Sequence, residues 1–68
     1  MKSRVKWFND AKGFGFIEYG DGKDIFVHYS EIRMAGYKKL EQASDVEFDL
    51  IHTDKGLQAK NVIPISVQ

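Results

Sequence analysis

Two short aromatic segments, residues 12–17 and 24–29, hold the side chains of this chain that could do the most specific chemistry. Both alternate with a period of two, which is the side-chain period of a β-strand. If both segments are strands, Phe14 and Phe16 share one face of the first, and Phe26 lies on one face of the second. Flat rings that face water have little use unless another flat group stacks on them. The pattern therefore indicates binding of unpaired nucleic-acid bases.

The ionisable neighbours of these rings decide which face of the two strands points to water. Glu18, Asp24 and His28 fall on the same face as the phenylalanines, whereas Ile17 and Val27 fall on the other. Burying three ionisable groups in so short a chain would cost several kcal/mol for each unpaired charge. We therefore expect the aliphatic face to form the core. The rings then form an exposed patch, which itself suggests a binding site.

Turn signals divide the chain into five strands that could position these rings. The expected strands are residues 3–9, 14–19, 24–28, 46–52 and 57 to about 67. Residues 29–45 do not alternate, so we expect one helical turn capped by Ser30 and then a long loop between strands 3 and 4. This layout predicts an all-β fold, a five-stranded antiparallel barrel. The expected core consists of Val5, Ile17, Ile25, Val27, Ile32, Val46, Phe48, Leu50 and either Val62 or Ile63.

Length and composition bound the class of protein. Residues 1–68 are enough for one small domain. The chain has no cysteine, which excludes disulfides and thiolate chemistry, and it has no apolar run long enough to cross a membrane. No phosphate-binding loop, metal cluster or acid–base pair is visible, so we expect no enzyme, no cofactor and no metal site. A soluble cytoplasmic protein that does not bind membranes is the expectation.

The ten basic and ten acidic residues cancel, but the basic residues are concentrated at the start of the chain. Residues 1–12 hold four basic residues against Asp10 alone. A local basic stripe could attract a phosphate backbone even on a neutral molecule, although the charge alone favours ordinary surface charge.

Four segments of the chain resemble the cold-shock protein family. Residues 12–17 (KGFGFI) resemble its first ribonucleoprotein motif, and residues 25–29 (IFVHY) resemble its second. Residues 5–9 (VKWFN) match the opening segment of the family, and residues 58–62 (QAKNV) resemble its last strand. The segments occur in order and cover essentially the whole chain.

The resemblance implies a single cold-shock domain over residues 1–68, built as an OB-fold barrel that binds single-stranded RNA or DNA. Tyr29 and Tyr37 stand where the family more often has Phe, and Tyr still stacks. The implied binding face consists of Lys6, Trp7, Lys12, Phe14, Phe16, Phe26, His28, Tyr29 and Tyr37.

The first strand contains a conflict between alternation and resemblance. Strict alternation puts Val5 and Trp7 on the same face. The resemblance puts Val5 in the core and Trp7 on the binding face. Both can hold only if the strand has a bulge or sharp twist near residues 6–7, which we therefore predict.

Several further residues have a predicted role. Lys6 and Lys12, together with Arg4 or Lys38, would contact phosphates. Asp24 and Gln58 could hydrogen-bond to base edges. His28 is expected to stack on a base, with a plain surface histidine as the alternative. Phe8 and Tyr19 are expected to be packing residues, and His52 is expected to be structural or exposed.

The predicted partners are single-stranded RNA and DNA, with pyrimidine-rich strands favoured, and no protein partner is required of a monomer. The resemblance implies a nucleic-acid chaperone that keeps RNA unpaired in the cold. The alternative is a small β-barrel module that binds peptides, such as proline-rich ones, through the same aromatic face.

Overall fold

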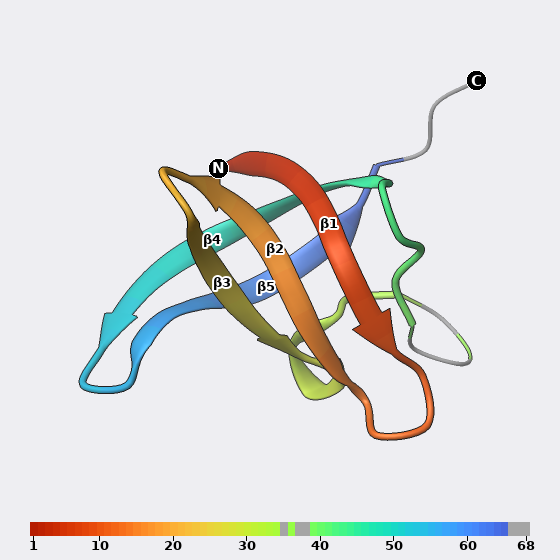
Figure 1. Cartoon of the computed structure of the whole chain (residues 1–68). Coiled ribbons are helices and arrows are strands. Elements are labelled where there is room, and N and C mark those ends of the chain that lie inside the picture. Colours follow the sequence, from red (N-terminus) through yellow and green to blue (C-terminus); the bar gives the residue numbers. More distant parts are fainter. Residues whose placement is uncertain (35, 37–38, 66–68) are drawn as a thin grey trace.

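Five strands wrap into a closed barrel, with β1, β2 and β3 at the front in Figure 1. The computed structural model describes residues 1–34, 36 and 39–65. Its elements are β1 (Lys2–Asn9), β2 (Phe14–Gly20), β3 (Lys23–His28), the 3₁₀ helix η1 (Tyr29–Glu31), β4 (Asp45–Thr53) and β5 (Gly56–Pro64). The first four strands lie within one residue of their expected bounds. The last strand ends at Pro64 instead of near residue 67. Proline has no N–H to donate to a neighbouring strand, which favours an end of the strand at Pro64.

The strand order around the barrel is β1-β2-β3-β5-β4, and β4 pairs with β1 to close it. Every adjacent pair is antiparallel except β3 and β5, which are parallel. The prediction of an all-β five-stranded barrel is confirmed. The prediction that all of its strand pairs are antiparallel was wrong for one pair, β3 and β5. A closed barrel with an odd number of strands cannot alternate direction throughout, so one neighbouring pair must run the same way.

The aliphatic face of β2 and β3 forms the core, as the ionisable residues predicted. Ile17, Ile25 and Val27 are fully buried, and none of the buried side chains among the described residues is polar. Leu50 is only partly buried against the core. Leu40 was missed because it lies in the non-alternating connection. The buried core consists of Val5, Ile17, Ile25, Val27, Ile32, Leu40, Val46, Phe48, Ala59 and Val62.

A bulge in β5 decides between the two core candidates of that strand. The β4–β5 register passes from Glu47↔Ile63 to a pairing of Asp49 with Lys60, so β5 carries an extra residue there. The bulge lets Val62 point inward three residues after the buried Ala59, instead of two or four. Val62 is therefore buried, while 48% of the Ile63 side chain is exposed.

The predicted bulge in β1 is present. Val5 pairs with Ile17 and Trp7 pairs with Phe16, so β1 has one more residue than β2 across this interval. Val5 is 1% exposed and Trp7 is 38% exposed. Strict alternation would put Val5 and Trp7 on the same face. The extra residue, Lys6, allows them to face opposite sides of the sheet.

Gly15 of β2 lets the bulged strand approach. A Cβ at this position would collide with the backbone carbonyl of Trp7 and would lie 2.7 Å from Cα of Phe8. These atoms belong to the backbone of β1, which cannot move aside as a flexible side chain could. Gly15 is buried, so its role is close packing of strands rather than close approach of a ligand.

The connection after β3 begins with η1 instead of a turn capped by Ser30. His28 is the N-cap, and its side chain accepts a hydrogen bond from the Ser30 backbone N–H. Ile32 then forms a bridge with Val62 and is buried, which fixes the start of the long loop against β5.

We expect Gly15→Ala to lower the free energy of unfolding by about 3 kcal/mol, because the added methyl group overpacks the β1–β2 contact. Urea denaturation measures this change. Glu18→Ala, an exposed position on the same strand, is the control and should stay within about 0.5 kcal/mol of the parent. Equal stability of the two variants would contradict the packing role of Gly15.

Candidate nucleic-acid interface

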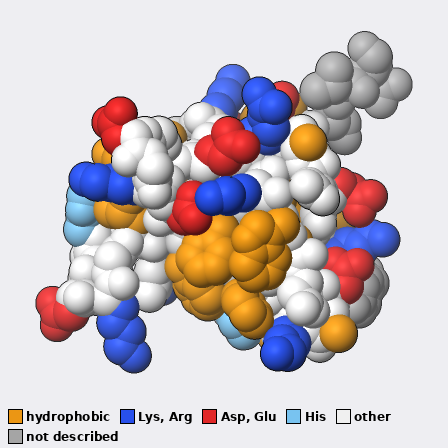
Figure 2. All heavy atoms as spheres, in the orientation of Figure 1, with side chains coloured by type: hydrophobic (Ala, Val, Ile, Leu, Met, Phe, Trp, Pro, Cys, Tyr) orange, Lys and Arg blue, Asp and Glu red, His pale blue; other side chains and the backbone are white. Residues whose placement is uncertain are grey.

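Four aromatic side chains from β1, β2 and β3 pack against one another on the outside of the barrel. The centroid distances are 5.7 Å for Trp7–Phe14 and 5.4 Å for Trp7–Phe16. Phe26 completes the group, at 5.9 Å from Phe14 and 5.8 Å from Phe16. We call these four residues the ring patch. Figure 2 shows a hydrophobic cluster at the centre of this face, with basic and acidic side chains along its upper edge.

The strand register builds this patch. Phe16 lies opposite Phe26, and Phe14 lies opposite His28. Trp7 is aligned with Phe16 through the bulge of β1. Centroid separations of 4.5–7 Å with tilted or offset planes are the arrangements that aromatic pairs prefer. The rings therefore hold one another in place while their outer surfaces stay open to water.

His28 and Tyr29 extend the aromatic surface beyond Phe14. Their ring centroids are 4.6 Å apart, and Tyr29 is 47% exposed. Nδ1 of His28 accepts from the Ser30 backbone N–H at 3.3 Å. The neutral tautomer that fits this bond carries its proton on Nε2, which can donate to a ligand.

Gly13 provides the place for the Tyr29 ring. Its φ of +78° is in the region that favours glycine, and a Cβ would lie 2.6 Å from Cδ1 of Tyr29. The Tyr29 backbone N–H also donates to the Gly13 carbonyl at 2.8 Å. This glycine thus serves the turn and the position of an exposed ring together.

One edge of the ring patch carries an ion pair. Glu18 and Asp24 lie directly opposite each other on β2 and β3, an arrangement of like charges that destabilises a sheet. Nζ of Lys6, the bulged residue of β1, lies 3.3 Å and 3.2 Å from the two Asp24 carboxylate oxygens. Lys6 relieves this repulsion and stands beside the rings. Lys12 is exposed in the turn at the other end of the patch.

A hollow of about 370 Å³ adjoins the ring patch on the β5 side. Gln58 is placed there because it pairs with Phe26 across the parallel β3–β5 contact. A base stacked on Phe16 or Phe26 would lie within reach of the Gln58 amide. The hollow is lined by Phe16, Phe26, Lys55, Leu57 and Gln58.

Comparison with known proteins is consistent with this geometry. The model of the "Cold-shock" DNA-binding domain matches residues 1–65. The chain belongs to the cold-shock domain family. Cold shock-like protein CspC of Bacillus cereus is 55% identical over 65 residues, covering 96% of this chain and 100% of that protein. Cold shock protein CspD of Bacillus subtilis (strain 168) is 48% identical over 65 residues, covering 96% and 98%.

A solved structure shares the cold-shock domain fold. The chain resembles drosophila Unr CSD456 with a TM-score of 0.74, over 98% of this chain and 28% of that one. The sequence identity is 24%, so this likeness concerns the fold alone. It supports the OB-fold barrel that the sequence predicted.

The cold-shock domain structure brings together most of the predicted site residues. The ring patch, the His28–Tyr29 pair and the Lys6–Asp24 pair lie on one continuous face, and Gln58 borders it. Tyr37 and Lys38 lie outside the described residues.

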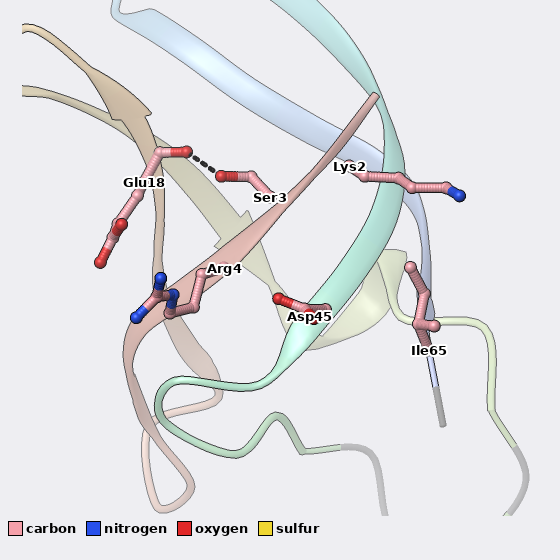
Figure 3. A pocket seen from close by; sticks show the side chains of 6 residues that line it. All are labelled: Lys2, Ser3, Arg4, Glu18, Asp45 and Ile65. Carbon is pink, nitrogen blue, oxygen red and sulfur yellow. Dashed lines mark hydrogen bonds between the residues drawn. The ribbon is translucent and has the colours of Figure 1, made fainter. Parts of the chain in front are cut away.

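Arg4 lies apart from the rings, in a hollow of about 510 Å³ on β1, β2 and β4. In Figure 3 its guanidinium points to the side where Glu18 lies, while Lys2 and Ile65 lie on the opposite side. None of the described residues that line this hollow is aromatic, and their basic and acidic side chains are equal in number.

Sequence reasoning missed Lys55 and Leu57, which line the hollow beside Phe26. Both lie at or near the β4–β5 turn, far along the chain from the aromatic segments. The Phe26–Gln58 pairing brings them near, and alternation within a single strand does not reveal a pairing between distant strands. The available signal was the position of Lys55, a basic residue in the turn shortly before the predicted site residue Gln58.

Metal-type clusters and membrane-spanning helices are both absent from the described part of the chain. Within residues 1–34, 36 and 39–65 there is no cluster of three or more side chains suited to holding a metal ion. No helix in these residues has the length and apolar character that crossing a membrane requires.

We expect Asp24→Asn to change the free energy of unfolding by less than about 1 kcal/mol. The Lys6 and Asp24 side chains are 50% and 32% exposed, so water and salt screen their attraction. Urea denaturation at low and high ionic strength measures the change, with Asp54→Asn in the exposed β4–β5 turn as the control. A much larger, salt-independent loss would mean that the ion pair acts as a buried one.

Proposed function

We propose that this cold-shock domain, acting over residues 1–68, is a non-enzymatic protein that binds single-stranded RNA and DNA. The observation that carries the proposal is the ring patch: four rings fixed against one another, open to water and bordered by lysines. The family to which the chain belongs, described as a DNA-binding domain, supports the same reading.

Stacking supplies most of the binding free energy in this proposal. Each base that stacks on an aromatic ring contributes about 1–3 kcal/mol. The ring patch and the His28–Tyr29 pair offer platforms for three or four bases. That gives roughly 4–10 kcal/mol before ordering costs, which corresponds to Kd values from about 1 mM down to about 50 nM.

Charge plays the smaller part. Lys6 and Lys12 meet phosphates, but Lys6 must share its ammonium with Asp24. The Asp24 carboxylate and the Gln58 amide give weak preference through hydrogen bonds to base edges. Pyrimidine-rich strands are favoured mainly through stacking and backbone flexibility. Duplexes bind poorly, because paired bases cannot present their faces to the rings.

The proposed cellular role is that of a nucleic-acid chaperone in the cytoplasm, acting as a monomer. A protein that binds only the unpaired state shifts a hairpin equilibrium toward single strands by mass action. This shift needs no ATP and no catalytic group. Its size depends on protein concentration and on affinity for the open strand.

Titration with a short thymidine oligonucleotide should quench the fluorescence of Trp7, the only tryptophan, at submicromolar to micromolar concentration. Two phosphate contacts give a slope of log K against log salt of about −1.4, which is shallow beside that of a basic duplex binder. A duplex of the same length should leave the signal nearly unchanged. A proline-rich peptide that displaces the oligonucleotide, or a single strand that has no effect, would contradict the proposal.

Phe14→Ala and Phe26→Ala should each weaken oligonucleotide binding roughly fivefold to a hundredfold, since each removes one stacking platform. Both side chains are only half-buried, so little stability should be lost. Val27→Ala is the matched control on β3, because Val27 is fully buried beneath the site. It should lower the free energy of unfolding by about 1.5–3 kcal/mol and leave the affinity of the folded protein unchanged. The opposite pattern would place the binding face elsewhere.

A further inference from the structure

A second hollow opens next to the one beside Phe16 and Phe26, at the seam between β3 and β5. It measures about 410 Å³ and lies between the β2–β3 and β4–β5 hairpins. Across the described residues, Phe26↔Gln58 is the single Cα pair in the β3–β5 register. The strand segments before that pair are not joined by a ladder, and the two hairpin turns lie well apart in Figure 1. The hollow is lined by Tyr19, Lys23, Asp24, His52, Gly56 and Leu57.

A bulge in β2 presents Tyr19 to this hollow. The β2–β3 register shifts by one residue between Glu18, which pairs with Asp24, and Gly20, which pairs with Lys23, so Tyr19 is the extra residue of the bulge. Strict alternation from the buried Ile17 would turn Tyr19 inward, yet its side chain is 39% exposed. The expectation that Tyr19 is a packing residue was therefore wrong. A bulge exposes this ring just as the bulge of β1 exposes Trp7.

His52 reaches the hollow from the other side of the seam. In the barrel order, β2 and β4 are the outer neighbours of β3 and β5, so Tyr19 and His52 flank the opening. Leu57, which pairs with His52 across the β4–β5 hairpin, supplies an apolar surface between them. Gly56 exposes backbone without a side chain.

The charged residues of the hollow complete the chemistry of a nucleotide site. Lys23 offers a cation for a phosphate, and Asp24 offers an acceptor for the N–H groups of a base edge. Two flat rings, a cation and an acceptor around an apolar surface match a flat base with one phosphate.

The hollow is continuous with the ring patch. Leu57 lines both this hollow and the one beside Phe16 and Phe26. Asp24 also belongs to both regions, through its ion pair with Lys6 at the edge of the rings. A strand stacked on the patch can therefore continue into the hollow without leaving the protein surface.

We propose that this hollow is an additional nucleotide subsite, in which Tyr19 and His52 flank one base and Lys23 meets its phosphate. The proposal rests on the proposed function, because it extends the same bound strand past the ring patch.

A length series of oligonucleotides tests this subsite. The probes are a thymidine oligonucleotide just long enough to cover the ring patch and versions lengthened by one or two nucleotides at either end. Trp7 fluorescence reports each Kd. In the parent protein one of the two extensions should tighten binding roughly fivefold to a hundredfold, the effect of one stacked base.

The double variant Tyr19→Val with His52→Ala should keep the affinity for the short probe and lose this gain. A longer homopolymer can place its nucleotides on the ring patch in more than one position along its length. Only the small gain in affinity from these extra positions should remain in the double variant. Tyr19→Phe, which keeps the ring, should retain the gain. An extension that carries an abasic nucleotide should lose the stacking part and keep only the phosphate contact of Lys23.

The outcomes separate the two proposals. If the parent binds the short probe but gains nothing on extension, or if the double variant keeps the full gain, the subsite is overturned and the ring patch stands. If the parent binds no single strand of any length, the proposed function itself is overturned. Both exchanged side chains are exposed, and thermal unfolding of each variant verifies that the barrel is intact.

Discussion

The backbone of β1 lies against Gly15 of β2, and the arrangement of the ring patch depends on this contact. The bulge at Lys6 turns Trp7 outward while Val5 stays in the core. The strand can follow this path because no Cβ stands between it and β2. One missing side chain in β2 thus decides where the largest ring of the protein lies. Without that approach, Trp7 would compete with Val5 for the core, and the remaining rings would lose a neighbour on one side.

The charges around the rings follow from the same arrangement. Half-buried phenylalanines share one face of β2 and β3 with ionisable residues, which keeps this face in water. It also sets Glu18 against Asp24, and the bulged Lys6 is the residue that reaches the second carboxylate. One bulge therefore both exposes a ring and moves a cation across β2. Stacking and charge meet at the edge of the patch through a single irregularity of the backbone.

Much of this architecture could be predicted from the sequence, because alternation and ionisable neighbours are local signals. The strands, the burial of Ile17 and Val27, the outward rings and the β1 bulge were all predicted. What was wrong, missed or left open depends on contacts between distant segments. The parallel β3–β5 pair, the place of Leu40, the burial of Val62 rather than Ile63 and the nearness of Lys55 to Phe26 arise when the barrel closes. The expectation that Tyr19 packs inward was wrong for a local reason. No glycine or proline stands at the bulged position to signal the irregularity.

The mutual packing of the four rings has a consequence for how a ligand would be received. Trp7, Phe14, Phe16 and Phe26 restrict one another's rotamers before any strand arrives. Immobilising a rotamer-rich side chain at an interface costs about 0.5–1.5 kcal/mol, and this platform has largely met that cost during folding. In the proposed complex, the loss of internal freedom on association would then fall mainly on the nucleic acid. The protein would be the rigid partner, and the flexible strand would adapt its shape to the protein.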